Sequence, residues 1–261
     1  MRVGFIGCGN LGFSLVRGLL GSGALKAGEV IASDLIGERL KRLRKLGIKT
    51  TIDNKKLVES CEVVFLAVKP DAVESVLKEV EGVSKGKLFI SVAAGVSTKF
   101  IEARTRARVA RIMPNICGAV GEMASCFSFG KDATSQDQKL IKRLLGSIGI
   151  TFKIDEKLMD AITGLSGSGP AYFYLFIRAL QEAGVQLGLS SEVALKLAAQ
   201  TAKGAGEMVL KMGATEDLTR QVCTPKGTTI EGIKVLEDRK VADAIKEAVK
   251  TAAKRARELS R

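Results

Sequence analysis

The 261-residue sequence predicts an α/β domain followed by an all-α domain. From Met1 to about Ile154, short β-branched runs alternate with amphipathic segments, a pattern typical of a doubly wound, mostly parallel sheet. From Leu158 on, the strand signals cease and long segments with helical apolar spacing follow. We therefore expect one domain over residues 1–157 and a second, helical domain over residues 158–261.

The strands of the first domain are expected where β-branched and aromatic residues cluster between turn residues. In chain order they are Arg2–Ile6, Val30–Ser33, Ile48–Thr51, Val63–Val68, Leu88–Val92 and Val109–Ile112. Further on, Cys126–Phe129 and Thr151–Ile154 look like edge strands on either side of a helix at about Ser135–Ser147. The first domain is expected to close there.

The helices of the second domain are long and rich in alanine. They are expected at about Ala171–Leu187, Glu192–Lys211, Glu216–Cys223, Thr229–Glu237 and Val241–Glu258. Alanine-rich helices pack closely and can expose broad apolar faces. We therefore expect a homodimer, or a higher homo-oligomer, formed through these C-terminal helices.

The cysteine and histidine content bears on metal binding and on location. Five cysteines are scattered without a CxxC pair, and the chain has no histidine, so a metal site is not expected. An odd, dispersed set of cysteines fits reduced thiols in the cytoplasm better than a secreted disulfide framework. The rather apolar window from Leu165 to Leu189 contains Arg178 and Glu182, so we expect no membrane span.

The formal net charge of +13 would attract any polyanion, including nucleic acid. The densest basic segments, Arg39–Lys45 and Lys254–Arg261, lie in helical patterns without interleaved aromatic residues. Solvated helix faces explain this pattern better than a nucleic-acid site does, so no nucleic-acid partner is expected. A positive field would also favour an anionic cofactor and a carboxylate substrate.

A glycine-rich hexapeptide, Gly7-Cys8-Gly9-Asn10-Leu11-Gly12, directly follows the strand Val3-Gly4-Phe5-Ile6 and opens a helix. Gly7 permits a tight turn, Gly9 lets the backbone approach a pyrophosphate, and Gly12 allows the helix to pack closely. The helix N-terminus adds N–H donors and the positive end of the helix dipole. The next strand ends at Asp34, at the spacing along the chain from the glycines that the Rossmann fingerprint requires. The first domain is therefore expected to bind a dinucleotide.

Asp34 and its neighbours bear on which dinucleotide is used. A carboxylate at the end of the second strand can accept a hydrogen bond from a ribose 2′-hydroxyl, which favours NADH, and it would repel the 2′-phosphate of NADPH. Ser33, Asn54 and Arg39 could still accommodate that phosphate. The cofactor is therefore expected to be NADPH or NADH.

Three further segments follow strands of the predicted sheet, at the edge where doubly wound sheets bind ligands. Ala67-Val68-Lys69-Pro70 follows the fourth strand, Ala93-Ala94-Gly95 the fifth and Met113-Pro114-Asn115 the sixth. Their small residues would leave room for a nicotinamide ring. Pro70 could instead simply begin the next helix, and Asn115 could serve a turn beside Pro114.

Two glycine-rich segments lie in the second half of the chain, at 163–172 and at 224–230. Each precedes a helical pattern, with Pro170 at a first-turn position and Thr228 as a candidate N-cap. N–H groups at two helix starts could hold a small carboxylate, or the two segments could only connect helices.

These segments resemble motifs of the pyrroline-5-carboxylate reductase family. Thr-Gly-Leu-Ser-Gly-Ser-Gly-Pro-Ala-Tyr at 163–172 is similar to the family signature, and Thr-Pro-Lys-Gly-Thr-Thr-Ile at 224–230 is similar to its substrate loop. The first half contributes Gly-Phe-Ile-Gly-Cys-Gly-Asn-Leu, Phe-Leu-Ala-Val-Lys-Pro, Ala-Ala-Gly-Val and Met-Pro-Asn, in the family's order. The resemblance therefore spans essentially the whole chain.

The resemblance implies an oxidoreductase of proline biosynthesis that transfers hydride from NAD(P)H to the ring imine of 1-pyrroline-5-carboxylate, giving L-proline. It implies a helical substrate-binding and dimerisation domain that intertwines with a second subunit. The cofactor-binding residues would be Ile6, Gly7, Cys8, Gly9, Asn10, Leu11, Ser33, Asp34, Asn54, Ala67, Val68, Lys69, Pro70, Ala93 and Ala94. The residues that surround the substrate would be Ser168, Gly227, Thr228 and Thr229. Beyond the resemblance, we also expect Asn115, Gly169 and Lys226 to bind substrate, and Ser168 and Thr228 to be catalytic.

The chain departs from the family pattern in two places. Lys226 replaces a glycine of the usual Ser-Pro-Gly-Gly-Thr-Thr loop, where the backbone could need to approach the substrate or to adopt a positive φ. Lys226 could instead add a charge contact to a carboxylate. Ile116 and Cys117 replace the Thr-Pro that commonly follows Met-Pro-Asn. Both changes concern the shape of the substrate pocket.

The chemistry of an imine fits a chain without histidine. A dehydrogenase mechanism with a histidine base acting on a hydroxy acid is excluded, whereas an imine nitrogen can be protonated in water and the iminium then accepts hydride. We expect Thr228 to hydrogen-bond the ring nitrogen. Two alternatives stay open, namely a related imine or β-hydroxyacid-type reductase of another small acid and a dinucleotide-sensing protein without turnover.

Overall fold

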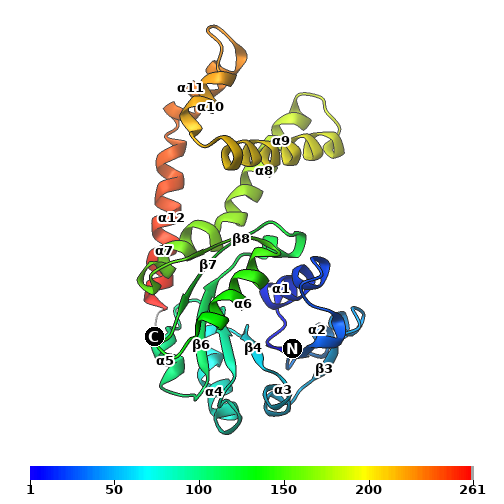
Figure 1. Ribbon diagram of the computed structural model, residues 1–261. Coiled ribbons are helices and arrows are strands. Elements are labelled where there is room, and N and C mark those ends of the chain that lie inside the picture. Colours follow the sequence, from blue (N-terminus) through cyan, green and yellow to red (C-terminus); the bar gives the residue numbers. More distant parts are fainter. Residues whose placement is uncertain (260–261) are drawn as a thin grey trace. The chain divides into compact units, whose positions relative to one another are not determined.

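The computed structural model describes residues 1–259, which form two compact units (Figure 1). The first unit comprises Met1–Ser168 together with the C-terminal residues from Lys250 on, and the second comprises Gly169–Val249. Residues 158–168 thus group with the first unit, and the domain boundary between 157 and 158 stays a prediction. In the described part of the chain, no helix is both long and apolar enough to cross a membrane.

The first unit is built on a sheet whose eight strands, within residues 1–259, follow the order β3-β2-β1-β4-β5-β6-β7-β8. The strands are β1 (Val3–Ile6), β2 (Val30–Ser33), β3 (Lys49–Thr51), β4 (Val63–Leu66), β5 (Leu88–Ser91), β6 (Arg108–Met113), β7 (Met123–Phe129) and β8 (Gly149–Lys153). All pairs from β3 to β6 are parallel, β7 runs antiparallel to β6, and β8 is parallel to β7. The predicted doubly wound, mostly parallel sheet is confirmed.

Helices cover both faces of this sheet (Figure 1). They are α1 (Asn10–Gly21), α2 (Gly37–Arg44), α3 (Asn54–Ser60), α4 (Pro70–Val80), α5 (Thr98–Glu102), α6 (Ser135–Gly146) and α7 (Met159–Ile162), with short helical turns at Ala27–Glu29, Glu81–Val83, Ile116–Val120, Glu156–Leu158 and Thr163–Gly167. Neighbouring residues of β1 point to opposite faces, so Phe5 joins a cluster with Leu15 of α1, and Ile6 joins one with Leu77 of α4. β1 is therefore buried on both sides, and its carboxyl end lies at the centre of the fold.

The second unit consists of helices alone among its described residues. These are α8 (Gly169–Gln186), α9 (Ser191–Met212), α10 (Thr215–Val222), α11 (Thr228–Asp238) and the first half of α12 (Val241–Glu258). α8 and α9 approach closely where Gly184 faces Ala194, since a Cβ on Gly184 would lie 3.0 Å from the Ala194 Cβ. Large apolar side chains such as Phe173, Leu187 and Leu210 are exposed, as the predicted apolar faces require.

The predicted elements agree with the observed ones to within a few residues, with one correction at Thr228. The turn from Thr224 to Gly227 closes when the Gly227 N–H donates to the Thr224 carbonyl at 2.9 Å, and the chain enters α11 one residue earlier than predicted. Gly227 is the N-cap, in an extended conformation, and Thr228 is the first helical residue. The expectation that Thr228 is the N-cap is wrong.

Candidate functional site

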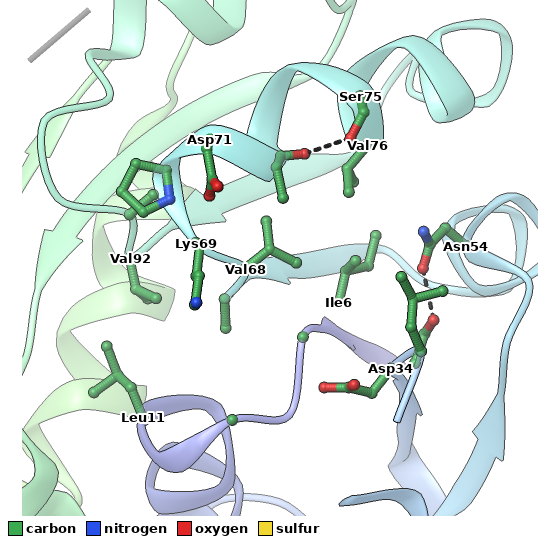
Figure 2. Close-up of a pocket in the computed structure, with 18 of the residues that line it drawn as sticks. Ile6, Leu11, Asp34, Asn54, Val68, Lys69, Asp71, Ser75, Val76 and Val92 are labelled. Atoms are coloured by element: carbon green, nitrogen blue, oxygen red, sulfur yellow. Dashed lines mark hydrogen bonds between the residues drawn. The ribbon is translucent and has the colours of Figure 1, made fainter. Parts of the chain in front are cut away.

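A pocket of about 850 Å³ lies at the carboxyl ends of β1, β2, β4 and β5 (Figure 2). β1 stands between β2 and β4, so the chain leaves β1 at the point where the strand order reverses. Such a switch point is where open parallel sheets bind ligands. The predicted cofactor-binding residues that line the pocket are Ile6, Gly7, Gly9, Asn10, Leu11, Ser33, Asp34, Asn54, Ala67, Val68, Lys69, Pro70, Ala93 and Ala94.

The glycines of the loop after β1 have distinct environments. Gly7 has a φ of 92°, and a Cβ there would lie 2.5 Å from the Ala67 carbonyl oxygen, so the fold itself requires glycine. A Cβ on Gly12 would collide with the Gly7 carbonyl. A Cβ on Gly9 would meet no protein atom within 4 Å, and Gly9 lines the pocket. The open side of Gly9 therefore leaves room for a ligand.

The N-terminus of α1 supplies hydrogen-bond donors beside Gly9. Gly9 is the N-cap and has no side chain to accept from the first-turn N–H groups, and the first turn holds no acidic residue. A helix start of this kind attracts an anion through its N–H groups and its dipole. The geometry fits the pyrophosphate of a dinucleotide.

Asp34, just after β2, is buried and held by three donors. Its Oδ2 accepts the backbone N–H of Cys8 at 2.7 Å, and its Oδ1 accepts the N–H of Ile36 at 2.8 Å. The Arg39 guanidinium lies 3.3 Å from Oδ2. Cys8 is buried beneath the loop and does not line the pocket. Its burial and the nearby charge of Asp34 raise the pKa of its thiol to about 12.

A second polar chain runs beside Asp34. The Ser33 hydroxyl donates to Asn54 Oδ1 at 2.6 Å, and the Asn54 amide donates to Glu79 Oε2 at 2.8 Å. Glu79 lines the pocket and was missed in the sequence, as were Ala72 and Ser75 on the same helix. Their spacing along α4 places them on one helical face, which is the signal that could have identified them.

The segment after β4 both begins a helix and lines the pocket. Pro70 begins α4, with Lys69 as the N-cap, and both residues also line the pocket. Figure 2 shows the Lys69 side chain extending into the pocket near Val68, Val92 and Leu11.

Asn115, predicted to contact substrate, is buried outside this pocket. Its Oδ1 accepts the N–H of Cys117 at 3.2 Å, and its amide donates to the Ser166 carbonyl at 3.1 Å. The turn function considered for Asn115 is thus present, and the same side chain fastens the segment Thr163–Gly167. Its contact with substrate stays a prediction.

The remaining predicted substrate residues fall in the two units. Ser168 and Gly169 follow a π-helical turn at Thr163–Gly167, a rare conformation that often occurs at functional sites. Lys226, Gly227, Thr228 and Thr229 belong to the second unit. Lys226 has a φ of 60°, which is the left-handed conformation expected for the glycine that it replaces. The convergence of the two segments on one substrate stays a prediction.

The two halves of the chain match two different family models. Residues 156–259 match the family model described as pyrroline-5-carboxylate reductase dimerisation, and residues 2–95 match the one described as NADP oxidoreductase, coenzyme F420-dependent. A pyrroline-5-carboxylate reductase of Arabidopsis thaliana is 40% identical over 265 residues, which cover 99% of this chain and 95% of the plant protein. The chain belongs to the pyrroline-5-carboxylate reductase family.

Other pyrroline-5-carboxylate reductases agree in sequence and in fold. The enzyme of Methanosarcina acetivorans is 40% identical over 265 residues, covering 100% of this chain and 98% of its own. A crystal structure of Plasmodium falciparum pyrroline carboxylate reductase with NADP bound superposes with a TM-score of 0.91 at 30% identity, covering 100% of this chain and 98% of that one. The resemblance drawn from the motifs is confirmed, as is the α/β-then-helical fold of a pyrroline-5-carboxylate reductase.

Proposed function

We propose that this chain reduces the ring imine of 1-pyrroline-5-carboxylate to L-proline with hydride from NADH or NADPH, the final step of proline biosynthesis. The observation that carries this function is the pocket at the switch point of the sheet, built from the glycine loop, the open N-terminus of α1 and Asp34. Relatives of full length at about 40% identity carry the name of this enzyme.

Each part of the dinucleotide lies against the loop that follows one of the strands. The N–H groups at the start of α1 and the open side of Gly9 take the pyrophosphate, while Asp34 takes the adenosine ribose. Ala93 and Ala94, after β5, leave space for the nicotinamide ring, and the Lys69 ammonium lies in the same pocket. When bound, the nicotinamide supplies the hydride.

The substrate is held by the two glycine-rich segments. Ser168, Gly169 and Gly227 surround the substrate, while the first-turn N–H groups of α11 and the Thr229 hydroxyl donate to it. Lys226 adds a positive charge for the substrate carboxylate. The Thr228 hydroxyl oxygen accepts a hydrogen bond from the protonated ring nitrogen and orients the imine. Since the chain has no histidine, the proton on the imine nitrogen comes from water before hydride transfer, and catalysis is chiefly placement.

The assembly and location belong to the same proposal. The exposed apolar side chains of α8 and α9 pack against a second copy of the chain, giving a homodimer through the C-terminal helices. The five cysteines are free thiols, which suits the reducing cytoplasm. The partners are the small-molecule substrate and a second subunit, with no nucleic acid.

A spectrophotometric assay of nicotinamide oxidation tests the reaction. Robust turnover of pyrroline-5-carboxylate is expected with at least one coenzyme. Activity only with another imine or a β-keto acid would identify a related reductase instead, and coenzyme binding without any turnover would identify a sensing protein.

The Thr228 hydroxyl is tested by kinetics of Thr228→Val and Thr228→Ser. The valine variant is expected to lose about tenfold in kcat, the size of one hydrogen bond made in the transition state, while the serine variant keeps most of it. Unchanged kcat and KM in Thr228→Val would remove this hydroxyl from the mechanism.

A further inference from the structure

The end of the pocket beside β2 bears on the choice between NADH and NADPH. NADH and NADPH differ only at the adenosine ribose, where NADPH carries a 2′-phosphate, a dianionic group that needs hydrogen-bond donors. In a dinucleotide-binding sheet this ribose lies at the carboxyl end of β2. In this chain Ser33, Asp34, Arg39, Asn54 and Glu79 line the pocket there.

Three side chains at this end, Ser33, Asn54 and Arg39, each already donate to an acceptor within the protein. The single hydroxyl proton of Ser33 is given to Asn54, and the Asn54 amide is given to Glu79 (Figure 2 shows the first of these bonds). The Arg39 guanidinium is paired with Asp34. A 2′-phosphate would have to compete with Asn54 for the Ser33 proton, with Glu79 for the Asn54 amide and with Asp34 for the Arg39 charge.

The charges at this end point in the same direction. Asp34 and Glu79 contribute two carboxylates, and Arg39 contributes one positive charge. A 2′-phosphate would therefore meet a net negative surface, with Asp34 too buried for water to screen it fully. A 2′-hydroxyl, in contrast, donates a hydrogen bond to a carboxylate such as Asp34.

We propose that Asp34 and Glu79 together make this chain prefer NADH over NADPH. Asp34 accepts the ribose hydroxyl and repels the phosphate directly. Glu79 is a positioning residue, which keeps the Asn54 amide turned away from the ribose. The inference rests on the proposed function only in that the pocket binds a nicotinamide dinucleotide.

Fluorescence titration of the full chain with NADH and with NADPH, in the absence of substrate, tests the preference. The unsubstituted chain is expected to bind NADH at least about tenfold more tightly. Asp34→Asn is expected to shift the ratio of the two Kd values towards NADPH by about 10- to 100-fold.

Three variants separate charge from position. Glu79→Ala, on an exposed face of α4, is expected to shift the ratio by about 3- to 10-fold, because it removes a charge and releases Asn54. Glu79→Gln retains an acceptor for Asn54 and is expected to shift the ratio less. Glu38→Gln removes an exposed carboxylate from α2 outside the pocket and is expected to leave the ratio unchanged.

The proposal is overturned if the unsubstituted chain binds NADPH as tightly as NADH, or if Asp34→Asn shifts the ratio no more than Glu38→Gln does. Equal shifts for Glu79→Ala and Glu79→Gln would overturn the positioning function of Glu79. The titration needs no substrate. A chain that prefers NADH but does not turn over pyrroline-5-carboxylate would therefore contradict the proposed reaction and still support the coenzyme preference.

Discussion

The Asp34 carboxylate accepts the backbone N–H of Cys8 at 2.7 Å, across 26 residues of chain. This bond fastens the end of β2 to the glycine loop after β1, so the residue expected to contact the ribose also fixes the loop expected to contact the pyrophosphate. The two halves of the dinucleotide fingerprint are therefore one structural unit in this fold.

The two glycines on either side of Cys8 can be separated by alanine substitution. Gly7→Ala places a side chain at a positive φ against the Ala67 carbonyl, and we expect it to lower the free energy of unfolding by about 2–4 kcal/mol. The Cβ of Gly9→Ala would meet open space, so we expect the free energy of unfolding to stay within about 0.5 kcal/mol of that of the unsubstituted chain. We expect NADH binding to be at least about tenfold weaker. Thermal melting and NADH titration measure both. A Gly9→Ala chain that binds NADH normally would show that the open side of Gly9 is not the pyrophosphate site.

Cys8 should resist alkylation although it lies in the dinucleotide-binding motif. With its pKa raised to about 12, its thiol would be ionised in only about one molecule in ten thousand at pH 8. We expect maleimide to leave Cys8 unmodified in the folded chain, whereas the partly exposed Cys223 reacts. Peptide mass mapping after a timed reaction checks this. Labelling of Cys8 at the rate of Cys223 would contradict it.

Asp137 stabilises the start of α6. It accepts from Arg108 Nε at 2.7 Å and Nη2 at 3.1 Å, and it completes a capping box with Thr134. Burial alone would raise the pKa of Asp137, but the bonds from Arg108 and Thr134 outweigh burial and lower the pKa from its ordinary value of 3.8. A lowered pKa means that the stabilisation is present above pH 3.8 and is lost as the pH falls through the folded-state value.

We therefore expect Asp137→Asn to lower the free energy of unfolding by about 2–3 kcal/mol at pH 7, with the difference shrinking below about pH 4. Asp132→Asn changes an exposed carboxylate in the preceding turn, and its free energy of unfolding should stay within about 0.5 kcal/mol of that of the unsubstituted chain. Urea unfolding across this pH range measures both variants. A difference that grows on acidification would refute the assignment.

Lys226 combines an unfavourable backbone conformation with an exposed charge. Lys226→Gly should raise the stability by about 0.5–1 kcal/mol, because glycine adopts a φ of 60° readily, whereas Lys226→Ala should not. If the ammonium contacts the substrate carboxylate as proposed, both variants raise KM for pyrroline-5-carboxylate, by about 3- to 10-fold. An unchanged KM in Lys226→Ala would leave only the backbone effect.

The local pattern of the sequence was sufficient to predict the strand, turn and helix around Gly7. The strand and the helix each have their own periodicity, and glycine marks the turn between them. The position of Asp34 followed from the same pattern. β7 was predicted too short, starting at Cys126 rather than Met123, because the buried Ser125 interrupts the apolar run. Its hydroxyl is satisfied by the Ile150 carbonyl of β8, a partner that only the tertiary fold provides.

The polar contacts of the site were harder to predict than its position. That Asn54 donates to Glu79, and Asn115 to Ser166, depends on how separate elements pack against each other. Nothing in the spacing of these residues along the chain indicates such pairs. A positive φ at Lys226 was one of two alternatives considered, since the residue stands where related chains have glycine, and the structure shows that φ.

The open side of Gly9 has a consequence for reading relatives of this chain. Gly7 and Gly12 are demanded by the polypeptide itself, whereas Gly9 is demanded only by whatever molecule lies against it. In a lineage that kept the fold but no longer bound the coenzyme, Gly9 could be substituted, while Gly7 and Gly12 would be retained. A substitution confined to that position would then mark a descendant that still folds but no longer carries out redox chemistry.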